Sequence, residues 1–182
     1  MLTLVLGGAR SGKSTLAVAW GREHAEAGGD VQFLATAPSD DTSLAERIAR
    51  HRAERPGWPT IEEPIELAAA LAGLAADDMV IVDCLTLWVS NLMARGDGID
   101  AIVKASEQFA TAAHERSGPT VVISNEVGMG VHPATELGRD YRDTLGLVNQ
   151  RVSTLADRAA FLVAGRVLEL GDQLASSTPA AT

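Results

Sequence analysis

Residues 7–14 read GGARSGKS and match the pattern G-x-x-x-x-G-K-[ST] in full. The apolar run LTLVL (2–6) precedes them, and a helical pattern from about Lys13 to Ala27 follows. Glycines let the backbone turn so that successive N–H groups point at one anion, and the helix adds the positive end of its dipole. The stretch therefore predicts a phosphate-binding loop in which Lys13 reaches the β- and γ-phosphates and Ser14 ligates Mg²⁺. The alternative is a glycine-rich turn that binds nothing.

Beyond this loop, apolar β-rich runs alternate with helical patterns. The runs that we predict to be strands are VQFLAT (31–36), TIEE (60–63), MVIVD (79–83), TVVIS (120–124), AAFLVAG (159–165) and RVLEL (166–170). The predicted helices cover about 40–52, 65–75, 85–94, 100–116 and 136–157. This alternation predicts an α/β fold with a mainly parallel sheet, closed by a C-terminal antiparallel hairpin around a tight turn at Gly165-Arg166. With the phosphate loop, it indicates a RecA-like, three-layer P-loop NTPase.

Composition limits the class of protein. The 182 residues predict one catalytic domain over 1–170, and the small, polar stretch 171–182 predicts a disordered tail. A formal net charge of −9 with no basic face along the chain argues against nucleic-acid binding. We see no apolar run long enough for a membrane span and no signal peptide. The single cysteine, Cys84, suits a reducing cytoplasm and a small buried side chain.

An acidic residue ends the most apolar predicted strand. In VIVD (80–83), Asp83 stands where P-loop proteins hold Mg²⁺, directly or through water. The alternative is that Asp83 only caps the next helix. The guanine-reading pattern N-K-x-D of GTPase switches is absent, because the corresponding strand end reads SNEV (124–127). These observations predict nucleoside triphosphate binding but do not name a reaction.

The segment ERIARHRAER (46–55) gathers four arginines around a histidine in an acidic chain. On a helix, Arg47 and Arg55 lie one turn on either side of His51 and share its face. Such a face suits a polyphosphate, and the nearby cations disfavour the imidazolium, which leaves a neutral ring able to attack phosphorus. The alternative is a solvated helix face in which the two glutamates of the segment pair with Arg50.

Six segments occur in a definite order: GGARSGKS (7–14), LATA (34–37), RIARHRAERP (47–56), WPTIEEP (58–64), IVDCLTLWVSNL (81–92) and SNEVGMGVHP (124–133). Together, over about residues 1–170, they resemble the bifunctional adenosylcobinamide kinases and adenosylcobinamide-phosphate guanylyltransferases of cobalamin synthesis. The resemblance implies phosphorylation of adenosylcobinamide by ATP or GTP. It further implies transfer of GMP from GTP to a histidine, with release of pyrophosphate, and then to the new phosphate, which gives adenosylcobinamide-GDP.

The resemblance also implies roles for individual residues. His51 corresponds to the guanylylated histidine, and Ser14 and Asp83 correspond to the Mg²⁺ site. The positions that it assigns to nucleotide binding are Gly7, Gly8, Ala9, Arg10, Ser11, Gly12, Lys13, Ser14, Ala35, Thr36, Ala37, Arg52, Ala53, Glu54, Arg55, Glu62 and Asp83. Members of the family often have serine where Ala37 stands, and alanine offers no side-chain hydrogen bond at that position. The Glu62 carboxylate could read guanine N1–H and N2–H₂, or it could be a solvated strand end.

Other residues keep two interpretations. Trp58 and Trp88 can pack in the core, which we favour, or stack on a corrin ring. His132 lies in a Gly-containing loop that could be a lid or a subunit contact. Asn125 and Glu126 follow a parallel strand, where ligands of α/β proteins bind, so a substrate role is plausible without a specific assignment.

Two alternatives to the bifunctional enzyme stay open. One is a P-loop kinase for another small alcohol, in which His51 is only electrostatic. The other is a regulatory or assembly ATPase that transfers nothing to a small molecule. The resemblance implies a homo-oligomer, for which we expect a trimer, with small-molecule substrates as its partners.

Overall fold

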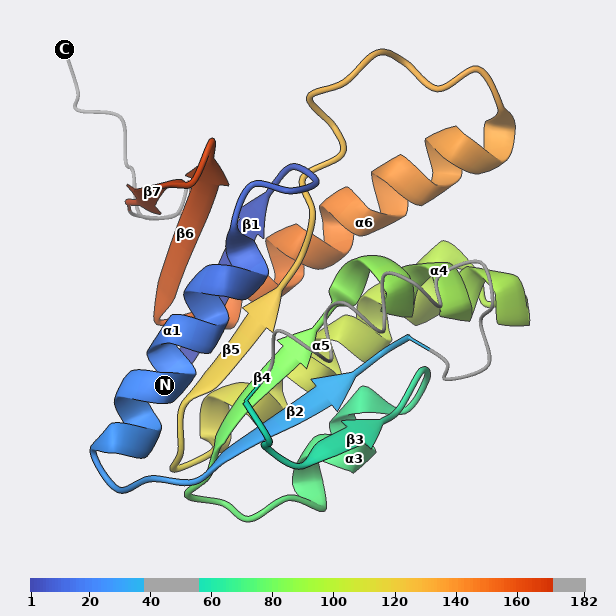
Figure 1. Ribbon diagram of the computed structural model, residues 1–182. Coiled ribbons are helices and arrows are strands. Elements are labelled where there is room, and N and C mark those ends of the chain that lie inside the picture. Colours follow the sequence, from blue (N-terminus) through green and yellow to red (C-terminus); the bar gives the residue numbers. More distant parts are fainter. Residues whose placement is uncertain (38–55, 172–182) are drawn as a thin grey trace, which may run out of the picture.

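A seven-stranded sheet crosses the middle of the computed structural model, which describes residues 1–37 and 56–171 (Figure 1). Its strands are β1 (Leu2–Gly7), β2 (Val31–Ala35), β3 (Thr60–Glu62), β4 (Met79–Asp83), β5 (Thr120–Ile123), β6 (Arg158–Val163) and β7 (Arg166–Leu170). They are ordered β3-β2-β4-β5-β1-β6-β7. All neighbours pair in parallel except β6 and β7, which form an antiparallel hairpin. The predicted mainly parallel sheet with a C-terminal hairpin is therefore confirmed.

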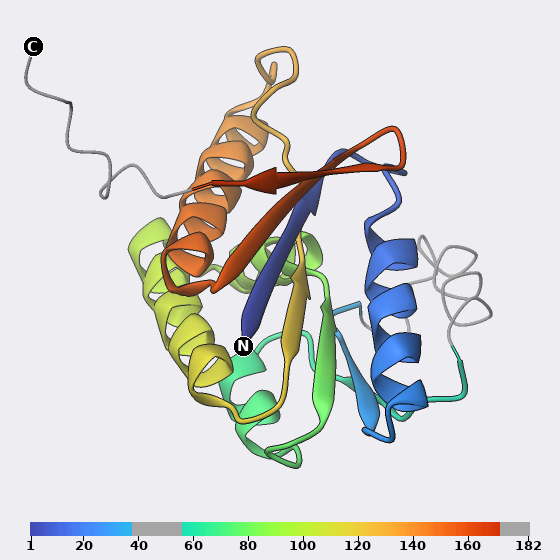
Figure 2. The same ribbon diagram turned by 90° about the vertical axis from the view of Figure 1, so that its left-hand side faces the viewer.

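Helices cover both faces of this sheet. They are α1 (Lys13–Glu26), α3 (Leu67–Ala72), α4 (Leu85–Arg95), α5 (Ile99–Glu115) and α6 (Glu136–Leu155). Figure 2 shows α1 on one side of the sheet and α5 and α6 on the other. The central strands carry unbroken apolar runs because side chains on both of their faces are buried. Within the described residues, no helix has the length and apolarity that crossing a membrane requires.

The core has two halves, one on each face of the sheet. Along β4, Val80 packs into the half that contains Trp88, whereas Ile81 packs into the half that faces α1. Trp88 is 1% exposed, and Trp58 stacks on Phe33 with their ring centroids 5.9 Å apart. Both tryptophans therefore belong to the core, as favoured from the sequence.

Most predicted bounds lie within two residues of the observed ones, and two elements differ in an instructive way. The helix expected over 65–75 is shorter, since α3 covers only Leu67–Ala72. The hairpin turn consists of Ala164 and Gly165, with φ of 51° and 74°, and Arg166 already pairs with Val163. A two-residue turn with positive φ at both positions matches the twist of the flanking strands, so the turn lies one residue earlier than predicted. The helix predicted over 40–52 and the tail from 172 lie outside the described residues.

Candidate nucleotide-binding site

The parallel strands bring most of the predicted site residues to one edge of the sheet. We call this the carboxyl edge, because the parallel strands β1 to β6 end there. The strand register pairs Ala35 with both Glu62 and Asp83, and it pairs Ile123 with both Asp83 and Val5. The phosphate loop, Gly7–Ser14, follows β1 at the same edge (Figure 1). Ligands of open α/β sheets bind in this position.

Local geometry explains two of the three glycines of the phosphate loop. A Cβ on Gly7 would lie 2.5 Å from the carbonyl oxygen of Leu162 in β6, so no larger residue fits there. Gly12, directly before α1, has a φ of 102°, which favours glycine. Gly8 meets nothing within 4 Å, so space does not require glycine at this position. Arg10 takes a left-handed φ of 57°.

The Lys13 ammonium lies inside the phosphate loop. The Lys13 side chain is buried, and Nζ donates to the carbonyl oxygens of Gly7 at 2.8 Å and Gly8 at 2.6 Å. Helix α1 has no acidic residue in its first turn and no side-chain cap at Gly12. The Lys13 ammonium and the N-terminus of α1 therefore lie together, with no carboxylate in the first turn of the helix to neutralise them. This arrangement is typical of a site that binds a phosphate group.

Two backbone hydrogen bonds hold the phosphate loop from either side. Glu126 N, after β5, donates to Gly7 O at 3.2 Å. Gly165 N, in the β6–β7 turn, donates to Ser11 O at 3.1 Å. These two hydrogen bonds could not be predicted from the sequence, because a backbone hydrogen bond depends on where the chain lies and requires no particular side chain.

Thr36 supports the end of β4. Its hydroxyl is fully buried, donates to Cys84 O at 2.8 Å and accepts from Cys84 N at 2.9 Å, while Thr36 N donates to Asp83 O at 3.1 Å. Asn91 of α4 donates its amide to Thr36 O at 2.8 Å. The Thr36 hydroxyl thus forms its hydrogen bonds with the backbone of Cys84, the residue that follows Asp83. A buried polar residue at the end of a strand was the available signal for this role.

Asp83 ends β4, and Cys84, not Asp83, occupies the N-cap position of α4. Cys84 is buried and its thiol is in no disulfide, as expected for a small side chain in the core. Hydroxyl and carboxylate oxygens such as those of Ser14 and Asp83 are ligands that Mg²⁺ accepts in proteins. Among residues 1–37 and 56–171, no group of three or more His, Cys, Asp or Glu side chains could hold a metal by itself. The donor set therefore fits a Mg²⁺ ion that phosphates and water also coordinate.

The two adjacent glutamates at the end of β3, Glu62 within the strand and Glu63 after it, differ in their surroundings. Glu63 Oε1 accepts hydrogen bonds from the backbone nitrogens of Ile65 and Glu66, both at 2.8 Å, and this turn replaces the first residues of the helix predicted from 65. Glu62 is exposed and lies next to Ala35 at the carboxyl edge. Of the pair, Glu62 is therefore the better placed to meet a nucleotide.

His51 and the segment Arg52–Arg55 lie outside the described residues. Ala37, the last described residue before them, is half-buried and follows β2 at the carboxyl edge. The arrangement of His51 around a phosphate therefore stays a prediction from the sequence.

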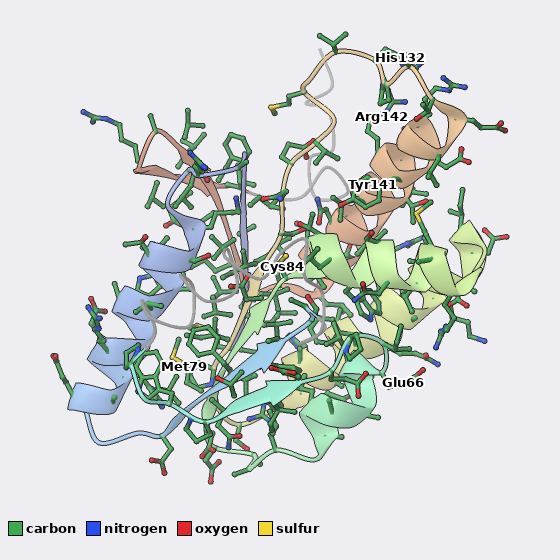
Figure 3. The ribbon with its side chains drawn as sticks, turned by 45° about the vertical axis from the view of Figure 1, so that its right-hand side comes forward. Glu66, Met79, Cys84, His132, Tyr141 and Arg142 are labelled. Carbon is green, nitrogen blue, oxygen red and sulfur yellow. The ribbon has the colours of Figure 1, made fainter. Side chains whose placement is uncertain are left out.

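The loop between β5 and α6 extends away from the sheet. His132 Nδ1 lies 2.9 Å from Arg142 Nη1, and Figure 3 shows both side chains at the outer end of the loop, far from Cys84. Met129 and Val131 are 80% and 96% exposed. Tyr141, at the start of α6, donates its hydroxyl to Thr86 O at 3.1 Å, and burial raises the pKa of Tyr141 to about 12.

Comparison with known proteins identifies relatives along nearly the whole chain. Residues 3–170 match the family model described as cobinamide kinase / cobinamide phosphate guanyltransferase. The bifunctional adenosylcobalamin biosynthesis protein CobP of Pseudomonas aeruginosa is 43% identical over 172 residues, which are 93% of this chain and 97% of the relative. The bifunctional adenosylcobalamin biosynthesis protein CobU of Salmonella typhimurium is 36% identical, over 91% of this chain and 97% of the relative.

Solved structures share the fold at low identity. One solved structure, described as an ATPase domain, aligns with a TM-score of 0.51 and 12% identity, over 89% of this chain and 69% of that chain. An ATPase of a bacterial type III secretion system aligns with a TM-score of 0.53 and 12% identity, over 89% of this chain and 51% of that chain. These neighbours share the predicted α/β fold and carry no information on activity or substrate.

Proposed function

From the premise that the chain belongs to the cobinamide kinase / cobinamide phosphate guanyltransferase family, we propose that it is a bifunctional enzyme of cobalamin biosynthesis. It phosphorylates adenosylcobinamide with ATP or GTP, and it then converts the phosphate to adenosylcobinamide-GDP with a second molecule of GTP. The observation that carries this proposal is the family match over residues 3–170, which includes both the phosphate loop and the His51 segment.

In the kinase reaction, the aminopropanol hydroxyl oxygen of adenosylcobinamide bonds to the γ-phosphorus. The bond from that phosphorus to the β,γ-bridging oxygen breaks, the nucleoside diphosphate leaves, and the hydroxyl proton passes to solvent. Lys13 holds the β- and γ-phosphates by exchanging its bonds to the Gly7 and Gly8 carbonyls for bonds to phosphate oxygens. The donors of the phosphate loop and α1 then neutralise the charge on the transferred group.

Ser14 and Asp83 are the residues that would hold Mg²⁺. The ion, when bound with the nucleotide, neutralises negative charge on the phosphates. Ser14 contributes a hydroxyl from the first turn of α1, and Asp83 contributes a carboxylate from the end of β4. The backbone support from Thr36 keeps the β4–α4 junction in position for this task.

In the guanylyltransferase reaction, a ring nitrogen of His51 bonds to the α-phosphorus of GTP, and the bond to the α,β-bridging oxygen breaks, so that pyrophosphate leaves. The imidazole gives up its ring proton to solvent as the phosphoramidate forms. A phosphate oxygen of adenosylcobinamide phosphate then displaces His51 from the phosphorus, and the ring takes up a proton. Arg52–Arg55 contact the nucleotide, and Glu62 accepts from guanine N1–H and N2–H₂.

The proposal extends to assembly and location. We expect one catalytic domain over residues 1–170 that forms a homotrimer in the cytoplasm, with adenosylcobinamide and nucleotides as its ligands. The kinase-only alternative is not favoured, because the relatives that match over more than nine-tenths of this chain are named bifunctional.

The test follows the α-phosphate of GTP. Incubation with GTP labelled at the α-phosphate should give a covalent label that survives base, is lost in acid and is absent in His51→Ala. His114→Ala is the matched control, because His114 is 47% exposed on α5, and it should keep the label. If wild-type protein phosphorylates adenosylcobinamide but never takes up the label, the guanylyltransferase half is wrong. If it phosphorylates nothing, the ATPase alternative replaces the whole proposal.

A further inference from the structure

Asn125 occupies a central position at the carboxyl edge. It follows β5, which lies between β4, the strand that ends in Asp83, and β1, the strand that leads into the phosphate loop. Ile123, two residues earlier, is in register with both Asp83 and Val5. The next residue, Glu126, donates its backbone N–H to Gly7 O. Asn125 is therefore held between the two parts of the site that are expected to meet the phosphates.

The backbone of Asn125 is fixed on both of its polar atoms. Asn125 N donates to Thr86 Oγ1 of α4 at 3.0 Å, and Asn125 O accepts from Asn149 Nδ2 of α6 at 3.0 Å. Asn149 is 6% exposed, and its Oδ1 accepts from Ser124 Oγ at 2.6 Å. Two helices, α4 and α6, thus hold the backbone of Asn125 in position, and neither of these bonds uses the Asn125 side chain.

The Asn125 carboxamide has no hydrogen bond to any residue in the described ranges 1–37 and 56–171. The residue is half-buried, and a half-buried amide with one acceptor and two donors ordinarily finds a partner. Side chains along this stretch alternate between faces: Ile123 packs on the α1 side, and Ser124 bonds to α6 on the other side. An extended backbone that continued this alternation past the end of β5 would turn Asn125 toward the α1 side, where the phosphate loop begins.

Building on the proposed function, we propose that Asn125 is a catalytic residue of the kinase half-reaction. Its carboxamide N–H donates a hydrogen bond to a non-bridging oxygen of the γ-phosphoryl group during transfer to the acceptor hydroxyl. The amide neither gives nor takes a proton: the phosphorus still gains one bond to the acceptor oxygen and loses one to the bridging oxygen. The carboxamide is a neutral donor held on a fixed backbone, and it bonds to a γ-phosphoryl oxygen other than the one that Lys13 contacts. Donors already in place before the reaction stabilise the charge that develops in the transition state.

The Asn125 side chain can be removed without loss of the hydrogen bonds that hold its backbone, so the test separates a catalytic role from a structural one. Asn125→Ala keeps the backbone bond to Thr86, the bond from Asn149 and the neighbouring bond from Glu126 N to Gly7 O, so its melting temperature should stay within about 2 °C of wild type. Its kcat for phosphorylation of adenosylcobinamide should fall about 100-fold, as for the loss of one transition-state donor, with the KM for ATP changed less than about threefold. Asn125→Asp should fall further, since a carboxylate repels the phosphoryl oxygens.

Asn149→Ala provides the structural comparison. It removes the amide that holds Asn125 O and leaves the Ser124 hydroxyl without the Asn149 acceptor, so it should lower the melting temperature by several degrees. Labelling of His51 by GTP labelled at the α-phosphate is the second readout. That reaction occurs at a different phosphorus and should change less than about threefold in Asn125→Ala.

The outcomes separate this inference from the proposed function. If wild-type protein phosphorylates adenosylcobinamide and Asn125→Ala retains kcat within about threefold, Asn125 does not contact the transferred group. If Asn125→Ala loses both half-reactions and melts as low as Asn149→Ala, its role is structural and the inference is wrong. A selective loss of kinase kcat at unchanged melting temperature supports it.

Discussion

Replacement of Gly7 by alanine tests how tightly the phosphate loop is built against β6. The added Cβ would lie 2.5 Å from Leu162 O and 2.7 Å from Ser11 Oγ. Leu162 O is a backbone atom of a paired strand, so it cannot move away without loss of strand pairing. Overlap of this kind costs about 1–3 kcal/mol. A side chain at the φ of 150° found here adds about 1–3 kcal/mol of strain.

A combined cost of about 4 kcal/mol, the middle of the summed range, corresponds to a fall of about 8–16 °C in melting temperature for a chain of this length. Gly8→Ala is the matched control inside the same motif, because its Cβ would meet nothing within 4 Å. We expect that variant to stay within about 0.5 kcal/mol of wild type. The measurement is thermal and urea unfolding of both variants without nucleotide.

Equal destabilisation by the two substitutions would refute this reasoning, because it would mean that the motif tolerates no side chain for a reason other than the approach of β6. A Gly7→Ala variant as stable as wild type would refute it as well, since the loop would then be free to move away from Leu162. Nucleotide binding, measured afterwards, shows whether the destabilised loop still closes around phosphate.

Three further predictions concern other parts of the site. Lys13→Ala should reduce both half-reactions by at least about 100-fold if one phosphate loop serves both, and full guanylylation in radiolabel assays would instead indicate a separate GTP site. Thr36→Val should cost about 2–3 kcal/mol in urea unfolding, because it removes the hydroxyl that pairs with the buried Cys84 N, while Cys84 O keeps its bond from Trp88 N, whereas Thr36→Ser should cost about 1 kcal/mol. Equal losses in the two variants would contradict the hydroxyl's role. Burial raises the pKa of Tyr141 to about 12, so the unfolded chain ionises first, and stability should be intact below pH 10 and fall as pH rises toward 12. Tyr141→Phe should flatten that decline in alkaline unfolding curves, and parallel curves would rule out Tyr141 as its source.

The parts of the fold that were predictable are those with a strong pattern in the sequence. The strands β1, β4 and β5 are unbroken apolar runs because both of their faces are covered, and this signal survives without any knowledge of partners. The phosphate loop was equally evident, because its spacing is set by the anion that such loops surround. Parallel pairing then brings Asp83 and Glu62 to the same edge as the loop.

The parts that were not predictable depend on distant contacts. The hydrogen bonds from Glu126 N and Gly165 N to the phosphate loop use backbone atoms, which every residue except proline offers. The role of Glu63 at the start of α3 could not be separated from that of Glu62, because the two are identical neighbours until the turn is seen. Ala164 at a φ of 51° is uncommon for a residue with a Cβ, and this moved the hairpin turn by one position.

The support of the phosphate loop by β6 and the β6–β7 turn has a consequence for biosynthesis on the ribosome. Residues 7–14 are synthesised well before residues 158–170, but Leu162 pairs with Gly7, and Gly165 bonds to Ser11. A growing chain cannot complete the loop until the hairpin has left the exit tunnel. Nascent fragments that end before residue 158 should therefore bind no triphosphate, although they contain the entire motif. A segment translated early thus becomes competent only when a segment translated about 150 residues later has arrived.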